Sequence, residues 1–259
     1  KTAYEIRLSL VGSEMCIRDR YSPLYGRYSP LMRRIYVIAN SKRKPEIIPI
    51  LNDLLPWLKN CATVVKVDKG GDGDLSRIKA DLILVFGGDG SILAVARRLR
   101  GNPIPVFGVN MGQLGFLAET SPAELQKTLP RVLRGDYVLS SRMMLQVRVA
   151  NGISGKRKGV PSEFLALNDA VLLRLPKASM MAVEVRVCGE EVAQYKGDGL
   201  IVSTATGSTG YSLSAGGPIL SERLKAMIVT PICPHTLANR PIVLAGDETL
   251  EIRAETRTG

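Results

Sequence analysis

Hydrophobic positions in residues 32–135 follow two alternating patterns. Short apolar runs predict buried strands at 34–40, 62–68, 81–86 and 104–110. Between these runs, apolar residues recur every three or four positions, which predicts helices at 44–60, 91–101 and 121–135 and a shorter one at 75–80. Pro56 is expected to kink or shorten the first of these helices. Strands that alternate with helices in this way indicate an α/β domain with a parallel, Rossmann-like sheet.

After residue 135 the hydrophobic period changes to two. Val183, Val185 and Val187 alternate with Glu184 and Arg186, for example. This alternation is typical of strands with one buried face, so residues 136–259 are predicted to form an antiparallel all-β domain. The chain stops directly after the strand-like residues 248–255, and we expect the second domain to be truncated at its C-terminus.

The first 31 residues follow neither pattern. They also lack the layout of a signal peptide. Part of the segment, YEIRLSLVGSEMCIRDR, looks like a translated vector or adapter sequence. We therefore predict a non-native or disordered leader at 1–31, with the natural start at Met32, where the first strand opens.

Composition narrows the classes of function. A net charge of +11 favours an anionic partner, which could be nucleic acid, a membrane surface or a phosphorylated small molecule. Aromatic residues make up only 5% of the chain and do not interleave with basic residues, which argues against nucleic acid. No run of 18 apolar residues is present, so no membrane span is expected. The four cysteines are far apart, which argues against a zinc site or disulfides and favours the cytoplasm.

The tetrapeptide Gly-Gly-Asp-Gly occurs twice, at 70–73 and at 87–90. Charged residues flank the first copy, which predicts a solvated turn with glycine at positive φ. The second copy lies between the most apolar predicted strand and a helix, where open α/β sheets bind ligands. Glycines and a helix N-terminus suit phosphate groups there. Asp89 could then act as a general base or bind Mg²⁺, and the alternative is a tight strand-to-helix turn without a ligand.

Polar residues in three other apolar segments strengthen the case for a site. Asn110 follows the next strand and should lie beside Asp89 at the same sheet edge. Asn168 and Asp169 are predicted inside an apolar strand, where buried polar groups need partners, although an edge-strand Asx turn would also explain them. Residues 197–220 run from a strand into a loop rich in glycine, serine and threonine, which offers hydroxyls and amides to a polar ligand. The basic residues at 97, 98 and 100 are predicted to be a solvated helix end, or else a contact for a phosphate donor.

Together these segments resemble the NAD kinase family, from Met32 to the end of the chain. The resemblance is carried by residues 87–91, 108–117, Asn168 with Asp169, Asp198 with Gly199, 206–219 and 230–244. The chain departs from the family where Asp169 replaces a common Glu and Gly210 a common Ala. No P-loop and no G-x-G-x-x-G fingerprint is present, so ordinary nucleotide motifs do not explain the pattern.

The resemblance implies transfer of a phosphoryl group from ATP, or polyphosphate, to the 2′-hydroxyl of the adenosine ribose of NAD, giving NADP. It implies Asp89 as general base, Mg²⁺ held mainly through substrate phosphates rather than by assigned protein ligands, and a homo-oligomer, either dimer or tetramer. The residues it assigns to NAD or ATP are Gly87, Gly88, Gly90, Asn110, Asn168, Asp169, Asp198, Thr206, Gly207, Ser208, Thr209, Gly210 and Tyr211.

Two other functions stay open at this point. Lipid kinases of the diacylglycerol and sphingosine type carry a related Gly-Gly-Asp-Gly loop, although the polar segment 204–212 argues against a lipid substrate. A non-catalytic NAD-binding fragment is the second alternative, because the family continues beyond the point where this chain stops.

Overall fold

The computed structural model describes residues 2–18, 33–41, 44–112, 115–118, 120–150, 163–176, 178–235 and 240–256, with the backbone alone for 2–18, 150 and 256. The chain divides into two compact units. One comprises Ser13–Ser141, and the other comprises Lys1–Gly12 with Arg142–Gly259. The division falls within a strand that runs from one unit into the other, β6 (Val138–Ala150), whereas the sequence places the boundary at residue 135.

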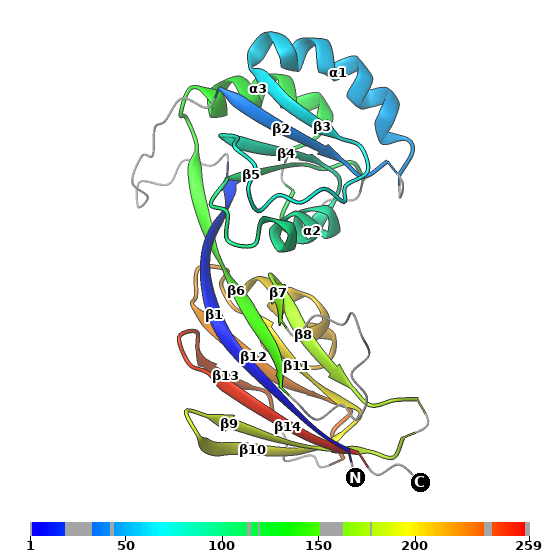
Figure 1. Cartoon of the computed structure of the whole chain (residues 1–259), viewed down its shortest axis with the longest axis vertical. Coiled ribbons are helices and arrows are strands. Elements are labelled where there is room, and N and C mark those ends of the chain that lie inside the picture. The colour runs from blue at the N-terminus through cyan, green and yellow to red at the C-terminus, as the bar shows by residue number, and fades with distance from the viewer. Residues whose placement is uncertain are drawn as a thin grey trace. The chain divides into compact units, whose positions relative to one another are not determined.

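The unit Ser13–Ser141 contains a parallel sheet in the order β5-β4-β2-β3. Its strands are β2 (Arg34–Ala39), β3 (Thr63–Asp68), β4 (Leu82–Phe86) and β5 (Val106–Val109). Its helices are α1 (Ile47–Cys61), α2 (Asp89–Leu99) and α3 (Pro122–Leu133). α1 and α3 share one core cluster with one face of the sheet, and Figure 1 shows α2 on the opposite face. The predicted parallel α/β fold is confirmed.

A local sequence signal accounts for the start of α3, whereas α1 and α2 begin without a side-chain cap. α3 begins with a capping box, in which the Glu124 N–H donates to Ser121 Oγ and the Ser121 N–H donates to the Glu124 carboxylate. α1 continues past Pro56 to Cys61, so the expected shortening does not occur. The predicted helix at 75–80 is wrong, because these residues form a turn and irregular backbone.

The other unit is built from antiparallel strands. β9 (Met181–Val187) pairs with β10 (Glu190–Gly197) and with β14 (Leu250–Thr256), and β6 pairs with β7 (Glu163–Ala166). A second sheet has the order β13-β12-β11-β8, from β8 (Asp169–Leu173), β11 (Gly199–Thr204), β12 (Ala226–Ile232) and β13 (Ile242–Ala245). Inward residues such as Val185 and Val202 from the two sheets form one core, which confirms the predicted period of two.

Residues 2–18 form a strand where the sequence predicts no regular element. This strand, β1 (Thr2–Arg18), pairs antiparallel with β14 from Thr2 to Leu8, and Cys16 pairs with Val106 of β5. Apolar and polar residues alternate from Tyr4 to Leu10, as in a strand with one buried face, but the resemblance of this segment to a vector sequence led to a different prediction. In the described part of the chain, no helix is long and apolar enough to cross a membrane.

Candidate functional site

The second Gly-Gly-Asp-Gly copy joins the buried strand β4 to helix α2. Gly87 is buried, and its N–H donates to the Val109 carbonyl of the neighbouring strand at 2.9 Å. A Cβ atom at Gly87 would lie 2.2 Å from Ser91 Oγ, so the turn itself requires glycine. No heavy atom comes within 4 Å of such a Cβ at Gly88 or Gly90. The backbone at these two glycines is therefore open to the approach of another molecule.

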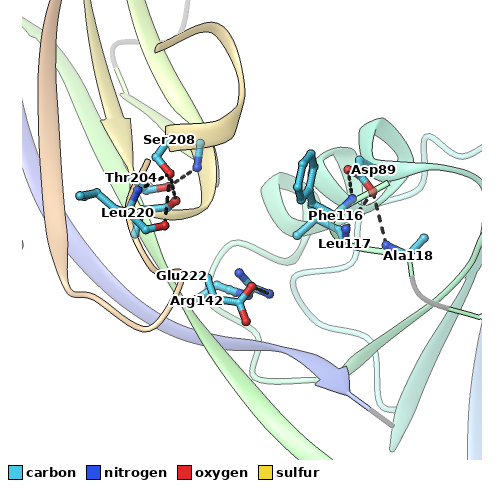
Figure 2. A network of polar contacts seen from close by, with 11 residues as sticks. Asp89, Phe116, Leu117, Ala118, Arg142, Thr204, Ser208, Leu220 and Glu222 are labelled. Atoms are coloured by element: carbon cyan, nitrogen blue, oxygen red, sulfur yellow. Dashed lines mark hydrogen bonds and ion pairs between the residues drawn. The ribbon is translucent and has the colours of Figure 1, made fainter. Parts of the chain in front are cut away.

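The Asp89 carboxylate is held by three backbone amides of the segment after β5. Oδ2 accepts from the Phe116 N–H at 2.8 Å, and Oδ1 accepts from the Leu117 and Ala118 N–H groups at 3.0 and 3.3 Å (Figure 2). Gly115 makes this approach possible, because a Cβ there would lie 2.3 Å from Oδ1. A carboxylate oxygen has two lone pairs, so among these contacts Oδ2 retains capacity to accept one further proton donor.

Asn110 lies at the same sheet edge, as the sequence predicted from the parallel order of β4 and β5. Its backbone N–H donates to the Thr120 carbonyl at 2.7 Å, and its Oδ1 accepts from the Gly112 N–H at 3.1 Å. The buried amide side chain thereby shapes the turn that leads to the Asp89 contacts. Lys44 comes to the same turn, since its Nζ would lie 3.3 Å from a Cβ on Gly112.

The first Gly-Gly-Asp-Gly copy is a loop with glycine at positive φ, as predicted. Gly71 has φ +66°, and its N–H donates to Asp68 Oδ1. Arg98 was expected at a solvated helix end, but its side chain is 15% exposed and donates to Asp68 Oδ2 and the Gly73 carbonyl, both at 2.6 Å. Burial and the Asp68 carboxylate raise the pKa of the nearby Tyr36 phenol. This loop is thus fastened to α2 by internal contacts.

Asn168 and Asp169 lie at the beginning of β8 rather than inside a strand as predicted. The Asn168 carbonyl accepts from the Thr204 N–H at 2.8 Å, which joins it to the end of β11. Asn168 Oδ1 is buried and has no hydrogen-bond partner among the described residues. Burial raises the pKa of the Asp169 carboxyl group. Both side chains lie within 4 Å of a Cβ built on Gly210, so the pair faces the loop after β11.

That loop begins with a 3-10 turn, η1 (Thr206–Thr209), and continues into a short helix, α4 (Tyr211–Ser214). Gly207 packs on the Asn168 carbonyl, which a Cβ would approach to 2.2 Å. Ser208 is fully buried, and its hydroxyl donates to the Ala205 carbonyl at 2.7 Å and accepts from the Leu220 N–H at 3.0 Å (Figure 2). Thr206 and Thr209 are partly exposed and Tyr211 is exposed.

Asp198 lies between β10 and β11 and forms an ion pair. Its Oδ1 accepts from Arg174 Nε at 2.6 Å, and the two side chains are 40% and 30% exposed. Arg174 also donates to the Ala178 carbonyl at 3.1 Å, which fixes the guanidinium. The sequence assigned Asp198 to the site without its partner, because Arg174 lies 24 positions away and its pairing depends on the β8–β11 register.

These residues form two sets of groups with different chemistry. One unit presents open glycine backbone at a helix N-terminus and a carboxylate with one accepting position left, which suits a phosphate group and a hydroxyl. The other presents a half-buried carboxylate, an unsatisfied amide oxygen and threonine hydroxyls, which suit a polar ligand rich in hydroxyls. In the described part of the chain, no group of three or more His, Cys, Asp or Glu side chains could hold a metal ion.

Comparison with known proteins gives the same family in both halves of the chain. Residues 74–137 match the family model described as the ATP-NAD kinase N-terminal domain, and residues 167–259 match the ATP-NAD kinase C-terminal domain. The NAD kinase of Syntrophotalea carbinolica is 39% identical over 87% of this chain and 81% of its own length. The NAD kinase of Nitrosomonas europaea is also 39% identical, over 89% of this chain and 80% of its own length.

Two solved structures have a fold similar to that of this chain. A yeast NADH kinase complexed with NADH has a TM-score of 0.65 at 21% identity, and the match covers 96% of this chain and 88% of that one. An NAD kinase from Archaeoglobus fulgidus in complex with ATP has a TM-score of 0.63 at 26% identity, covering 86% of this chain and 90% of that one. The fold and the sequence therefore lead to one conclusion: the chain belongs to the NAD kinase family.

Proposed function

We propose that this chain is an NAD kinase that transfers the γ-phosphoryl group of ATP to the 2′-hydroxyl of the adenosine ribose of NAD. The 2′-oxygen forms the new bond to phosphorus, and the bond from phosphorus to the oxygen between the β- and γ-phosphates of ATP breaks. The proton of the hydroxyl goes to Asp89, and the products are NADP and ADP. The relatives named above support this activity.

The geometry of Asp89 is the observation that best supports the catalytic role. Three amides hold the carboxylate in one orientation, and Oδ2 accepts only one of them. A general base must lie within hydrogen-bond reach of the proton it takes and have a lone pair for it. We assign the proton to Oδ2. The open backbone of Gly88 and Gly90 beside it suits the donor phosphates.

The residues around the loop after β11 are proposed to bind NAD. Asn168 Oδ1 is a buried acceptor that a ribose hydroxyl or an amide N–H could satisfy. Asp169, and Asp198 through its second oxygen, would accept from hydroxyl groups, and Gly207, Gly210 and the hydroxyls of the loop would contact the same ligand. Ser208 differs, because its hydroxyl is occupied inside the protein and serves to close the loop.

Mg²⁺ is proposed to be carried by the substrate phosphates, where it would neutralise charge. Among the described residues, no group of three or more His, Cys, Asp or Glu side chains could hold the ion. We also propose a homo-oligomer. A cytoplasmic location is proposed as well, because the thiols of Cys61, Cys188 and Cys233 are free.

Family membership removes the support for a lipid substrate, which rested on one shared tetrapeptide.

The proposal is tested by NADP formation from NAD with ATP and Mg²⁺, and with polyphosphate as an alternative donor. Asp89→Asn should lower kcat by about 10²–10⁴-fold, the usual contribution of a general base. Asp72→Asn is the matched control, because it changes the same tetrapeptide in the loop that internal contacts hold, and we expect its activity to stay within twofold of the wild type.

Two results would contradict the proposal. If wild-type protein binds NAD in calorimetry but forms no NADP with either donor, the chain is an NAD-binding protein and not a kinase. If Asp89→Asn loses less than about tenfold in kcat, Asp89 is not the base, whatever the activity of the wild type.

A further inference from the structure

We propose that Arg142 is a positioning residue for the NAD-binding loop and acts through its ion pair with Glu222. This inference rests on the proposed function, since it concerns the loop at residues 206–220 to which NAD is assigned. The pair lies outside every motif of the sequence analysis. Its role would be to hold the C-terminal end of that loop in place.

The contact itself is short and buried. Arg142 Nη2 lies 2.6 Å from Glu222 Oε2, and the two side chains are 3% and 23% exposed. Arg142 Nε is also buried and has no hydrogen-bond partner among the described residues. An unsatisfied buried donor is unfavourable, so the guanidinium is kept at this position by what Nη2 contacts rather than by a complete set of partners.

Glu222 lies two residues after Leu220, where the loop is closed. The Leu220 N–H donates to Ser208 Oγ at 3.0 Å, and the same hydroxyl donates to the Ala205 carbonyl at 2.7 Å. Figure 2 shows the contact between Ser208 and Leu220 and, separately, the Arg142–Glu222 pair, which follows Leu220 by two positions in the sequence. A displacement of Glu222 would therefore shift Leu220 and loosen the turn Thr206–Thr209.

Because the Arg142–Glu222 ion pair is largely buried, a positioning role fits it better than a purely stabilising role. Buried ion pairs contribute little to stability compared with apolar residues of the same size, because both charges lose their hydration. Their better-supported use is to select one arrangement of the groups around them. Arg142 lies on β6, a long strand, so it is a rigid attachment point for the end of a loop that is also held by hydroxyl contacts, among them Ser208 with Ala205 and Leu220 and Ser212 with Thr230.

The test compares three variants with the wild type in the full chain. Arg142→Met with Glu222→Leu replaces the pair by apolar residues and should fold with an unchanged or higher Tm. We expect this double variant to raise KM for NAD about tenfold while kcat and KM for ATP stay within about twofold. Arg142→Lys should give an intermediate KM, because it keeps the charge but loses the fixed guanidinium geometry. Arg148→Met is the matched control, since Arg148 lies on the same strand as Arg142 but forms an exposed ion pair, with Glu163 of β7.

Hydrogen exchange provides a readout that does not depend on turnover. The Leu220 amide, protected by Ser208 Oγ, should exchange faster in the double variant, and the β9 amides should not change. If the wild type forms no NADP, calorimetric NAD affinity replaces KM, so failure of the proposed function is distinguished from failure of this inference. A stable double variant with wild-type NAD affinity and wild-type Leu220 exchange would overturn the proposal.

Discussion

The carboxylates of the two candidate sets differ at the level of single residues. Asp89 is surrounded by amide donors, whereas Asp169 is half-buried and its pKa is raised by burial. A group that loses hydration without full compensation weakens the fold in its charged form. The charged Asp169 side chain is therefore expected to lower the stability of the fold, as is common for carboxylates that bind ligands.

Replacement of Asp169 by Asn should show this cost. Because the folded protein holds the Asp169 proton more tightly than the unfolded chain does, wild-type stability decreases as pH rises from about 3.9, the ordinary Asp value, through the raised pKa. Asp169→Asn should thus have a higher Tm than wild type at pH 7, and the difference should shrink below about pH 4. KM for NAD should rise about tenfold at the same time. A Tm difference that is independent of pH would contradict the assignment, and thermal unfolding from pH 3 to 8 measures it.

Residue types were predictable from the sequence, but their contacts were not. Asp89, Asn110 and Asn168 follow or precede apolar segments, so hydrophobic patterning was enough to select them. The amides of residues 116–118 that hold Asp89, and the glycine at 115 that admits it, lie 26 or more positions away. Amides occur at nearly every residue, so no side-chain signal could identify these three.

At the scale of elements, two glycines near Asp89 have different roles, one in the fold and one in the proposed binding of a ligand. Gly90 lies in the first turn of α2, and a Cβ there would meet nothing within 4 Å. Gly115 instead leaves room for the Asp89 carboxylate. The same residue type therefore serves the fold at one position and leaves space for a ligand at another.

Alanine at these two positions should have opposite effects on stability. Gly90→Ala should stabilise the protein by roughly 0.5–1 kcal/mol, because alanine is the better helix former, yet it should lower kcat/KM for ATP at least tenfold if phosphate approaches the backbone there. Gly115→Ala should lower both Tm and kcat, since it displaces Asp89. Thermal unfolding and steady-state kinetics measure both. Full activity in Gly90→Ala would show that the donor does not approach this backbone.

The elements were largely predictable, and the exceptions have physical causes. Apolar runs predicted β2, β4 and β5, because strands buried on both faces need continuous hydrophobic residues. Residues 75–80 have helical periodicity over little more than one turn, and isolated short helices are not stable without packing. β1 was missed although Tyr4, Ile6, Leu8 and Leu10 alternate with Glu5, Arg7 and Ser9, because residues 1–31 were interpreted as a non-native leader.

Over the whole molecule, the positive charge is concentrated in one part of the chain. Residues 32–135 contain sixteen Lys and Arg against nine Asp and Glu, a net charge of +7. Residues 136–259 contain fourteen against twelve, a net charge of +2. The excess positive charge therefore lies in the same part of the chain as the helix N-terminus and the open glycines that we assign to the donor phosphates. A positive potential there would attract anions.

This asymmetry predicts different salt dependences for the two substrates. Raising the ionic strength from about 20 mM to about 500 mM shortens the Debye length from roughly 20 Å to roughly 4 Å, which screens surface charge. KM for ATP should then rise about five- to tenfold, because ATP carries more negative charge than NAD even with Mg²⁺ bound. KM for NAD should change by about twofold or less, and sucrose at matched osmolality should change neither. Equal increases in both constants would mean that the charge of residues 32–135 does not act on the donor, and the proposed assignment of the phosphates to the Gly87–Gly90 turn would lose its electrostatic support.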